Sequence, residues 1–414
     1  MDSTRKRFKY TAPRTIRVGV VGSGYVGSHF VTAFDGYQGL KISAVLSRRS
    51  SEIQQSFVRP DLLVSAIDEL LEKSDVVFEC SGDAVYAADI VNAAFRASRP
   101  VVTMNAEFHV TAGSYFADKG LLSEAEGDQP GSLAALNERI VEMGFRPLAY
   151  CNMKAFMNHR PSLEDMLFWA GKKGISLDKV TSFTDGTKLQ IEQALVANGL
   201  NASIDIQGMH GLRTSNLDDA ADFFGSRAKE SGKRLSDYIL YPNAPHGVFI
   251  VAEHDKSQHA FLEHVKMGQG PFYVLTQSDV LVHLQAPRTI RSLVQTGKAL
   301  LTNSSTPSVN VAAIAKAPLV PGQRISCGIG SFEVRGECVS IVNEPDAVPI
   351  GLLKDAVLRR KIVAGEILRM DDVELPETLA LKAWLATRDR VLGEEQDDLS
   401  ATLERSSITS IRNR

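Results

Sequence analysis

The chain has 414 residues, of which 44% are hydrophobic and 23% are charged, and its formal net charge is -3. This length allows two or three domains, and the composition is typical of a globular protein with a sizeable core. Because the charge is nearly balanced and the apolar runs are short, we expect neither a nucleic-acid partner nor a membrane segment. The four cysteines form no CxxC pair and no zinc spacing. We therefore expect a cytoplasmic protein with reduced thiols and no metal centre.

An apolar strand that runs into the glycine pattern GSGYVG is the most informative stretch of the chain. A helix is predicted to follow from about Ser28. In dinucleotide-binding folds the first glycine allows a tight turn, the second admits a pyrophosphate, and the third lets the helix pack on the strand. The helix N-terminus then holds the phosphates. The predicted phosphate-binding residues are Gly22, Gly24, Tyr25, Val26 and Gly27. The alternative is a glycine-rich turn in a domain that has lost its cofactor.

The next predicted strand, residues 41–47, ends in Ser47, Arg48 and Arg49 rather than in an acidic residue. In an NAD site, a carboxylate at this position accepts hydrogen bonds from the ribose 2′-hydroxyl, whereas arginine binds a 2′-phosphate. The strand end therefore favours NADP(H) as the cofactor. Two solvated arginines are the alternative interpretation.

Predicted strands at 75–82 and 100–104, with a helix at 85–97 between them, continue a regular alternation. Such alternation is typical of a doubly wound parallel sheet, which binds ligands beyond the carboxyl ends of its strands. The residues expected beside the nicotinamide end of the cofactor are Ser81, Gly82, Asn105 and Glu107. Ordinary turn chemistry also explains glycine and asparagine at strand ends.

A glycine-flanked acidic loop at 126–131 opens the next predicted helix. Pro130 suits the first helical turn, and Asp128 is predicted to cap the helix. Glu126 and Asp128 can instead hold a cation or orient a substrate hydroxyl, so both remain candidate substrate residues.

A predicted strand at 146–154 ends in Lys154, and a helix near 162–171 precedes the motif FTDGTKLQIE. In this motif Asp185 is a candidate helix cap, while Lys188 and Glu192 are four residues apart and share a helix face. A solvated ion pair is the simplest interpretation. The functional interpretation makes Asp185, Lys188, Glu192 and Lys154 catalytic residues, because hydride transfer needs a cationic donor near the carbonyl oxygen. Burial is expected to lower the lysine pKa enough for proton transfer.

The remaining sequence is less specific. Residues 201–241 look helical, with a helix near 216–229, and strands are predicted at 248–253 and 272–276. Between these strands, Lys266 and the turn at Gly268 offer a charge and backbone N–H groups for an anionic substrate, or form a plain turn. After residue 304 short strands are predicted at 324–327, 331–334 and 338–342.

Several motifs in one order resemble the homoserine-dehydrogenase-like oxidoreductases that carry a C-terminal SAF domain. The matching segments are GSGYVG, ECSG, VVTMNAE, EGDQPG, FTDGTKLQIEQALVAN and VKMGQGPFYVL, and the SAF-like segment is KIVAGEILRMDDVEL. The resemblance implies an α/β protein with an N-terminal Rossmann domain, a middle α/β catalytic domain and a small β-rich SAF-like domain. The corresponding ranges are a polar arm at 1–14, the NADP-binding domain at 15–125, the substrate domain at 126–303, the SAF-like domain at 304–392 and a flexible tail at 393–414.

The resemblance also implies an active site between the first two domains, with Lys188 and Glu192 facing it and Glu107, Glu126 and Asp128 nearby. Two departures from the family pattern argue against homoserine as the substrate. Glu107 follows the strand in a turn where the family carries lysine, and the family's His-Leu-Glu is replaced by a segment that ends in Gln285.

Three hypotheses follow. The leading one is an NADP(H)-dependent oxidoreductase that acts on a small polar hydroxy-carbonyl compound. We expect it to be a homodimer or a higher homo-oligomer. One branch of the family is similar in activity to 1-deoxy-D-xylulose-5-phosphate reductoisomerase, and an isomerising reductase of a ketose phosphate is the second hypothesis. It would need a divalent cation, with Glu107, Glu126 and Asp128 as the available ligands. The third is a non-catalytic NADP-binding or assembly protein.

Overall fold

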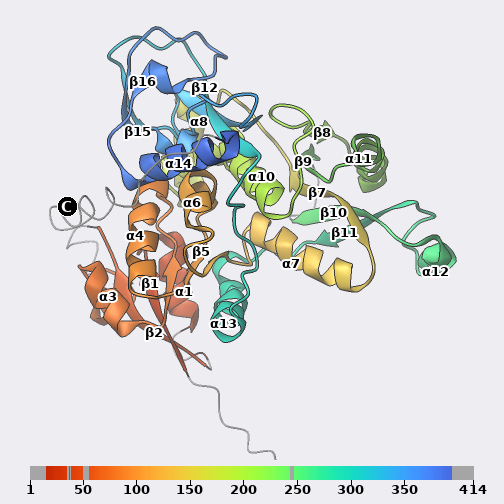
Figure 1. Cartoon of the computed structure of the whole chain (residues 1–414), viewed down its shortest axis with the longest axis horizontal. Helices are drawn as coiled ribbons and strands as arrows, with labels where there is room; N and C mark the ends of the chain where they lie inside the picture. Colours follow the sequence, from red (N-terminus) through yellow and green to blue (C-terminus); the bar gives the residue numbers. More distant parts are fainter. Residues whose placement is uncertain (1–14, 35–36, 38, 50–55, 243–246, 394–414) are drawn as a thin grey trace, which may run out of the picture.

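The computed structural model describes residues 15–34, 37, 39–49, 56–242 and 247–393. The predicted arm at 1–14 and positions 394–414 of the predicted tail lie outside the described residues. Figure 1 shows a first α/β unit, a second sheet unit beside it, and a C-terminal β module above the first unit.

The first unit is a six-stranded sheet in the order β3-β2-β1-β4-β5-β6, and all of its pairs are parallel. This is the strand order of a dinucleotide-binding doubly wound fold, so the predicted fold class is confirmed. The strands are β1 (Ile16–Val21), β2 (Leu40–Leu46), β3 (Leu63–Val64), β4 (Val76–Glu79), β5 (Val101–Thr103) and β6 (Leu122–Glu124). Their runs of Val, Ile and Phe are apolar on both sides because helices cover both faces.

The helices of the first unit are α1 (Tyr25–Phe34), α3 (Ile67–Lys73), α4 (Ala84–Arg96), α5 (Ala106–Phe108) and α6 (Ser114–Phe116). The sequence predicts two helices of this unit, from about Ser28 and at 85–97, and α1 and α4 differ from these ranges by only a few residues. The other helices of this unit were not predicted. A π-helical turn, η2 (His109–Gly113), joins α5 to α6. One face of the sheet packs on α3 and α4. The other packs on α1 and on α13 (Ala286–Thr296), a helix that the sequence assigns to the middle domain.

The second unit is a mixed sheet in the order β11-β10-β7-β9-β8. Its strands are β7 (Arg146–Lys154), β8 (Leu212–Arg213), β9 (Leu235–Leu240), β10 (Val248–Glu253) and β11 (Phe272–Gln277). Its helices are α7 (Gln129–Glu142), α8 (Leu163–Lys173), α9 (Leu177–Thr184), α10 (Thr187–Gly199), α11 (Leu217–Ser231) and α12 (His259–His264). Residues 201–241 are therefore not helical throughout, because β8 and β9 flank α11.

The C-terminal module pairs β12 with β14 and places β15 between β13 and β16. Its elements are β12 (Val309–Ala315), β13 (Arg324–Cys327), β14 (Val334–Ser340), β15 (Lys354–Leu358), β16 (Val373–Glu374) and α14 (Leu379–Leu392). The single strand β14 replaces the two strands predicted at 331–334 and 338–342. The helix α14 was not predicted, and its fully buried Trp384 packs into the core of the first unit.

The helix α10 connects the second unit to the C-terminal module. Eleven of its residues are buried, so this helix has no solvent-facing side. The Thr187 hydroxyl accepts a hydrogen bond from the Gly336 amide, and the Gln190 side-chain oxygen accepts one from the Cys338 amide. Because both amides belong to β14, the first turns of α10 are bonded directly to the C-terminal module.

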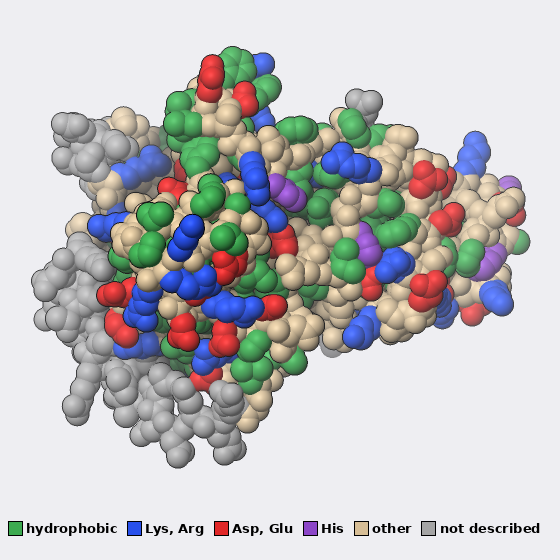
Figure 2. Space-filling view, turned by 90° about the horizontal axis from the view of Figure 1, so that it is seen from above, with side chains coloured by type: hydrophobic (Ala, Val, Ile, Leu, Met, Phe, Trp, Pro, Cys, Tyr) green, Lys and Arg blue, Asp and Glu red, His purple; other side chains and the backbone are tan. Residues whose placement is uncertain are grey.

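Charged side chains are interspersed on the surface of the module side. Seen from above, Lys and Arg lie among Asp and Glu over the left part of the molecule (Figure 2). The C-terminal module contains ion pairs of this kind, such as Arg360 with Asp372 and with Glu366. In the part of the chain that the structure describes, no helix is long and apolar enough to cross a membrane.

Candidate functional site

The predicted phosphate loop has the geometry that its glycines imply. Gly22 has φ +112°, and a Cβ on it would lie 2.9 Å from the Cys80 carbonyl oxygen. A Cβ on Gly27 would lie 1.9 Å from the Gly22 carbonyl oxygen, so α1 can pack this closely only with glycine there. A Cβ on Gly24 would meet a single atom within 4 Å, Nη2 of Arg49 at 3.4 Å. The loop therefore leaves space above Gly24, as a pyrophosphate requires.

The predicted neighbours Tyr25 and Val26 begin helix α1, and Tyr25 is 54% exposed. At the end of β2, Ser47 is buried and its hydroxyl lies 2.6 Å from the Ser23 hydroxyl, which holds the strand end against the loop. Arg49 lies over Gly24, as its distance to that position shows. The structure thus brings the glycine loop and the end of β2 together.

Arg48 is turned toward helix α4. Its guanidinium carbon lies 3.7 Å from the centroid of the Tyr86 ring, and its Nη2 lies 3.1 Å from Oδ2 of Asp83. Asp83 caps α4 by accepting a hydrogen bond from the Tyr86 amide. Oδ2 of Asp83, the oxygen that binds Arg48, also binds Nζ of Lys354, which belongs to the C-terminal module. Two cations, Arg48 from the end of β2 and Lys354 from the C-terminal module, therefore share the Asp83 carboxylate.

The residues predicted to contact the cofactor at the ends of β4 and β5 differ in how exposed they are. Gly82 is exposed with φ +69°, and a Cβ on it would meet nothing within 4 Å. The Asn105 side chain, by contrast, is fully buried: its amide donates to Glu79, and its oxygen accepts from the Phe108 amide. Asn105 therefore shapes the crevice from inside rather than contacting a ligand with its side chain. Ser81 is half-buried, and its amide donates to Glu79.

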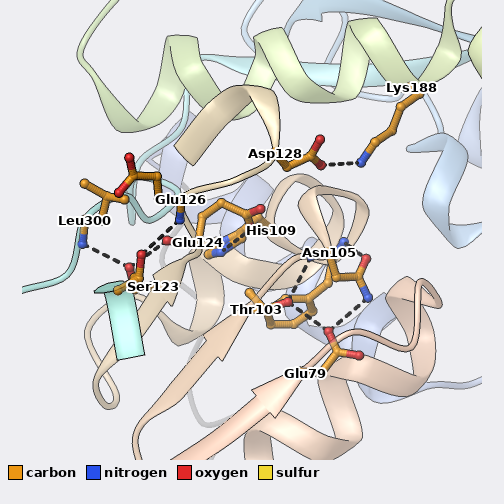
Figure 3. Close-up of polar contacts among 12 residues, drawn as sticks. Glu79, Thr103, Asn105, His109, Ser123, Glu124, Glu126, Asp128, Lys188 and Leu300 are labelled. Atoms are coloured by element: carbon orange, nitrogen blue, oxygen red, sulfur yellow. Dashed lines mark hydrogen bonds and ion pairs between the residues drawn. The ribbon is translucent and has the colours of Figure 1, made fainter. Parts of the chain in front are cut away.

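Lys188 and three carboxylates form the main polar cluster. Nζ of Lys188 lies 3.1 Å from Asp128 Oδ2, 3.5 Å from Glu107 Oε1 and 3.8 Å from Glu192 Oε1. Figure 3 shows Lys188 and Asp128 pointing toward one another. Glu107 comes from the first unit, while Asp128, Lys188 and Glu192 come from the second. The lysine side chain is 14% exposed, so it is not the solvated partner that the helical spacing alone suggests.

The position of Lys188 on its helix is unfavourable for a positive charge, and the carboxylates compensate for this. It lies in the first turn of α10, where the helix dipole disfavours a cation. Burial alone would lower the pKa of Lys188, but the charges of Asp128, Glu107 and Glu192 raise it well above its ordinary value. The expectation of a lowered pKa for Lys188 is therefore wrong. This lysine keeps its proton and acts as a fixed positive charge.

Glu192 lies between Lys188 and Lys154. Its Oε2 accepts a hydrogen bond of 2.9 Å from the Asn152 amide, which fixes the carboxyl group. Burial, with a further contribution from Asp128, raises the pKa of Glu192 to about 8, against the opposing charges of the two lysines. Burial also lowers the pKa of Lys154, an effect that Glu192 opposes. Glu192 and Lys154 are therefore the groups in this cluster whose pKa values move toward neutral pH, as proton transfer requires.

One residue that was predicted to be catalytic, Asp185, binds another partner. Asp185 forms a buried ion pair of 2.6 Å with Lys316 of the C-terminal module, and it also accepts a hydrogen bond from the Thr187 amide. The structure thus gives Asp185 a role in holding α10, whose N-cap is Gly186, rather than a place beside Lys188.

The acidic loop also departs from the prediction. Asp128 occupies the N-cap position of α7 but makes no side-chain capping bond, because its carboxylate binds Lys188 instead. Glu126 pairs with Arg288 at 2.9 Å and lines a small cavity of about 50 Å³. In Figure 3 its side chain points away from Lys188. Glu126 is therefore outside the cluster.

Lys266 and Gly268 lie at the other end of the second sheet. They precede Phe272, which pairs with Glu253, and Glu253 pairs with Arg146 at the start of β7. The cluster is at the opposite end of β7, where Asn152 binds Glu192. The strand separates the two ends by roughly 20 Å at about 3.3 Å per residue. These two residues are therefore not brought to the site.

Two buried acids at strand ends were not predicted. Glu79 accepts hydrogen bonds from Thr103, Asn105 and the Ser81 amide, which ties β4 to β5. Glu124 ends β6, and its Oε2 lies 3.5 Å from Nε2 of His109, with both side chains fully buried (Figure 3). Burial raises the pKa of Glu124 well above its ordinary value and lowers the pKa of His109 to about 3, so burial disfavours the charged form of both groups. A charged residue that ends an otherwise apolar strand was the available signal for both acids.

Among the described residues, no group of three or more His, Cys, Asp or Glu is arranged to hold a metal ion. All four cysteines are free thiols. The acidic residues that face one another share the ammonium of Lys188, and the predicted ligand Glu126 is engaged with Arg288.

A comparison with protein-family models matched one segment of the chain. Residues 127–286 match the family model described as oxidoreductase DRL, catalytic domain. This segment, which runs from the loop before α7 to the start of α13, is similar to the catalytic domain of an oxidoreductase. A search of curated proteins gave no match.

Solved structures with a similar arrangement are dehydrogenases and oxidoreductases. A homoserine dehydrogenase from S. aureus is 11% identical, with 78% of this chain and 93% of that chain covered and a TM-score of 0.39. A probable dehydrogenase from Thermotoga maritima is 11% identical, with 69% and 90% covered and a TM-score of 0.41. An oxidoreductase from Desulfitobacterium hafniense, described as NADPH-dependent, is 12% identical, with 70% and 90% covered and a TM-score of 0.36.

Proposed function

We propose that the chain is an NADP(H)-dependent oxidoreductase that acts on a small polar hydroxy-carbonyl compound. One observation carries the proposal: the ammonium of Lys188 lies within 3.1–3.8 Å of carboxylates from both units, and its side chain remains 14% exposed. A permanently charged, positioned donor of this kind is what stabilises an alkoxide during hydride transfer.

The cofactor fits the first unit. Gly24 leaves its side of the loop open, Gly82 faces open space, and Arg48 and Arg49 stand at the end of β2. These residues would hold the pyrophosphate and the 2′-phosphate. When bound, NADPH supplies the hydride.

The protein residues have separable roles in reduction. Lys188 binds the carbonyl oxygen and stabilises the negative charge that develops on it. Lys154, whose pKa burial lowers, donates the proton to that oxygen. Glu192 holds both lysines and returns the proton, because its own pKa is raised toward neutral pH. In the oxidation direction the same groups remove the alcohol proton.

The isomerising reduction of a ketose phosphate is a less suitable function for this site. It assigns Glu107, Glu126 and Asp128 to a bridging cation, whereas Glu107 and Asp128 bind Lys188 and Glu126 binds Arg288. The predicted anion-binding residues Lys266 and Gly268 lie at the far end of the sheet, so a phosphate group has no assigned partner in the cluster.

The test is NADPH oxidation by the full chain with a panel of hydroxy-aldehydes, keto acids and ketose phosphates. We expect turnover with a non-phosphorylated hydroxy-carbonyl compound, insensitivity of the rate to chelators, and loss of turnover in Lys188→Ala with retained NADPH binding. Turnover restricted to a ketose phosphate would favour the isomerising function. NADPH binding without turnover on the whole panel would contradict the proposal and favour a non-catalytic role.

A further inference from the structure

We propose that Lys354, carried by the C-terminal module, is a third cation of the cofactor's 2′-phosphate site. This inference rests on the proposed NADP(H) function and adds a residue that lies more than 300 positions after the phosphate loop in the sequence. It also assigns a ligand-binding role to the C-terminal module.

The first support is the position of the lysine. Nζ of Lys354 binds Oδ2 of Asp83 at 2.5 Å, and Nη2 of Arg48 lies 3.1 Å from the same oxygen. One carboxylate oxygen therefore holds two cations side by side at the end of β2. Arg49, the next residue after Arg48, lies over Gly24 of the phosphate loop. The Asp83 carboxylate offsets the repulsion between these two like charges of Arg48 and Lys354.

The charge of the group is the second support. Arg48 and Lys354 contribute two positive charges and Asp83 one negative charge, so these three groups together carry a charge of about +1. A phosphate monoester carries about -1.5 to -2 at neutral pH. The 2′-phosphate of NADP(H) would compensate this positive charge, whereas the ribose hydroxyl of NAD(H) would leave it uncompensated.

The third support is the rigid placement of Lys354. It begins β15 and pairs with Cys327 of β13, and the preceding residue, Leu353, is buried and accepts a hydrogen bond from the Gly328 amide. The turn before it, η5 (Ile350–Leu352), packs against α4. Figure 1 shows the module lying over the α4 side of the first unit. The lysine side chain is 37% exposed and Arg48 is 50% exposed, so an incoming phosphate can reach both.

The experiment measures equilibrium dissociation constants of NADPH and NADH for the full chain by nucleotide fluorescence, without substrate. Lys354→Ala should raise the Kd of NADPH about tenfold, because the phosphate contact is lost. It should leave the Kd of NADH unchanged within about twofold, because Asp83 loses one ion pair but keeps Arg48 as a partner. The matched control is Lys361→Ala, which removes an exposed lysine of the same module and should change neither constant.

A second variant tests the competition at Asp83. Asp83→Asn keeps a side chain that caps α4 but removes the negative charge, and it should tighten NADPH several-fold with no effect on NADH. As competitors of NADPH, 2′,5′-ADP should bind more weakly to Lys354→Ala and more tightly to Asp83→Asn, whereas 5′-AMP, which lacks the 2′-phosphate, should bind all variants equally. An unchanged ratio of NADPH to NADH affinity in Lys354→Ala, or equal weakening of both, would overturn the role of Lys354 while leaving the proposed function intact. Equal affinity of the unmodified chain for the two cofactors would overturn both the inference and the proposed NADP(H) preference.

Discussion

The replacement of Lys188 by methionine tests the proposed chemistry most directly, because it removes one charge and keeps the length of the side chain. At an effective dielectric constant of about 20, an ammonium at these distances attracts each of the three carboxylates by roughly 4–5 kcal/mol. Burial of the ions opposes this attraction by several kcal/mol per ion. The carboxylates can protonate or bind water after the change, so we expect a loss of stability near the lower end of the usual range, about 3 kcal/mol.

The effect on the reaction is expected to be larger than the effect on stability. The variant leaves Asp128 and Glu107 facing the substrate oxygen without a cation, at the point where negative charge develops. Loss of one preorganised donor lowers kcat by about 10²–10³-fold, or about 2.7–4 kcal/mol. Steady-state kinetics at saturating NADPH measures this change, and the Kd of NADPH should stay within about twofold because the phosphate loop is untouched.

A double variant separates catalysis from folding. Adding Glu107→Gln to Lys188→Met removes one of the unpaired carboxylates and should recover part of the lost stability, measured by urea denaturation, without restoring kcat. If Lys188→Met alone kept kcat within tenfold of the parent chain, Lys188 would be a structural residue and the assignment would fail. Recovery of kcat in the double variant would refute the reasoning in another way, because charge balance alone would then explain the defect.

Three further changes give separate tests. Because burial lowers the pKa of Lys154 and reduction needs its proton, kcat for reduction should fall as pH rises through that lowered value, and Lys154→Met should be slow and lack this alkaline decline. Gly27→Ala places a Cβ 1.9 Å from a carbonyl oxygen of the loop and should weaken NADPH binding at least about tenfold. Its control is Gly171→Ala, whose Cβ meets nothing within 4 Å and which should raise the melting temperature slightly, since alanine favours a helix by about 1 kcal/mol. Equal behaviour of the two variants would contradict the packing argument. Lys316→Met leaves Asp185 as an unpaired buried charge and should cost about 3–5 kcal/mol of unfolding free energy in urea, and a loss under about 1 kcal/mol would show that the pair does not hold α10.

Local patterns predicted the glycine loop and four strands of the first unit. The glycine loop depends on close backbone approach at Gly22 and Gly27, which is a property of consecutive residues. The apolar runs of β1, β4 and β5 reflect burial on both faces, which composition alone reveals. The limits of β7, Arg146–Lys154, were also predicted as found, because its run of apolar residues is bounded by charges.

The candidate site was harder to predict because its partners are distant in the sequence. Asp128 has the right type and place for a helix cap, yet its carboxylate binds Lys188, which is 60 residues away. A buried ammonium without a partner costs more than an uncapped helix end, so the long-range pair prevails over the local rule. The pKa of Lys188 reversed direction for the same reason: burial was foreseeable, but three converging carboxylates were not.

The C-terminal module shows how one distant segment can serve both halves of the proposed site. Its strand β14 binds α10 on either side of Lys188, through Thr187 and Gln190. Its strand β15 places Lys354 against Asp83 at the cofactor end, across 271 residues of sequence. The module therefore contacts both α10, which carries Lys188, and the N-terminus of α4, which Asp83 caps. In the proposed reaction Lys188 must lie at a fixed distance from the hydride donor. A rigid module that contacts both α10 and α4 would set that distance.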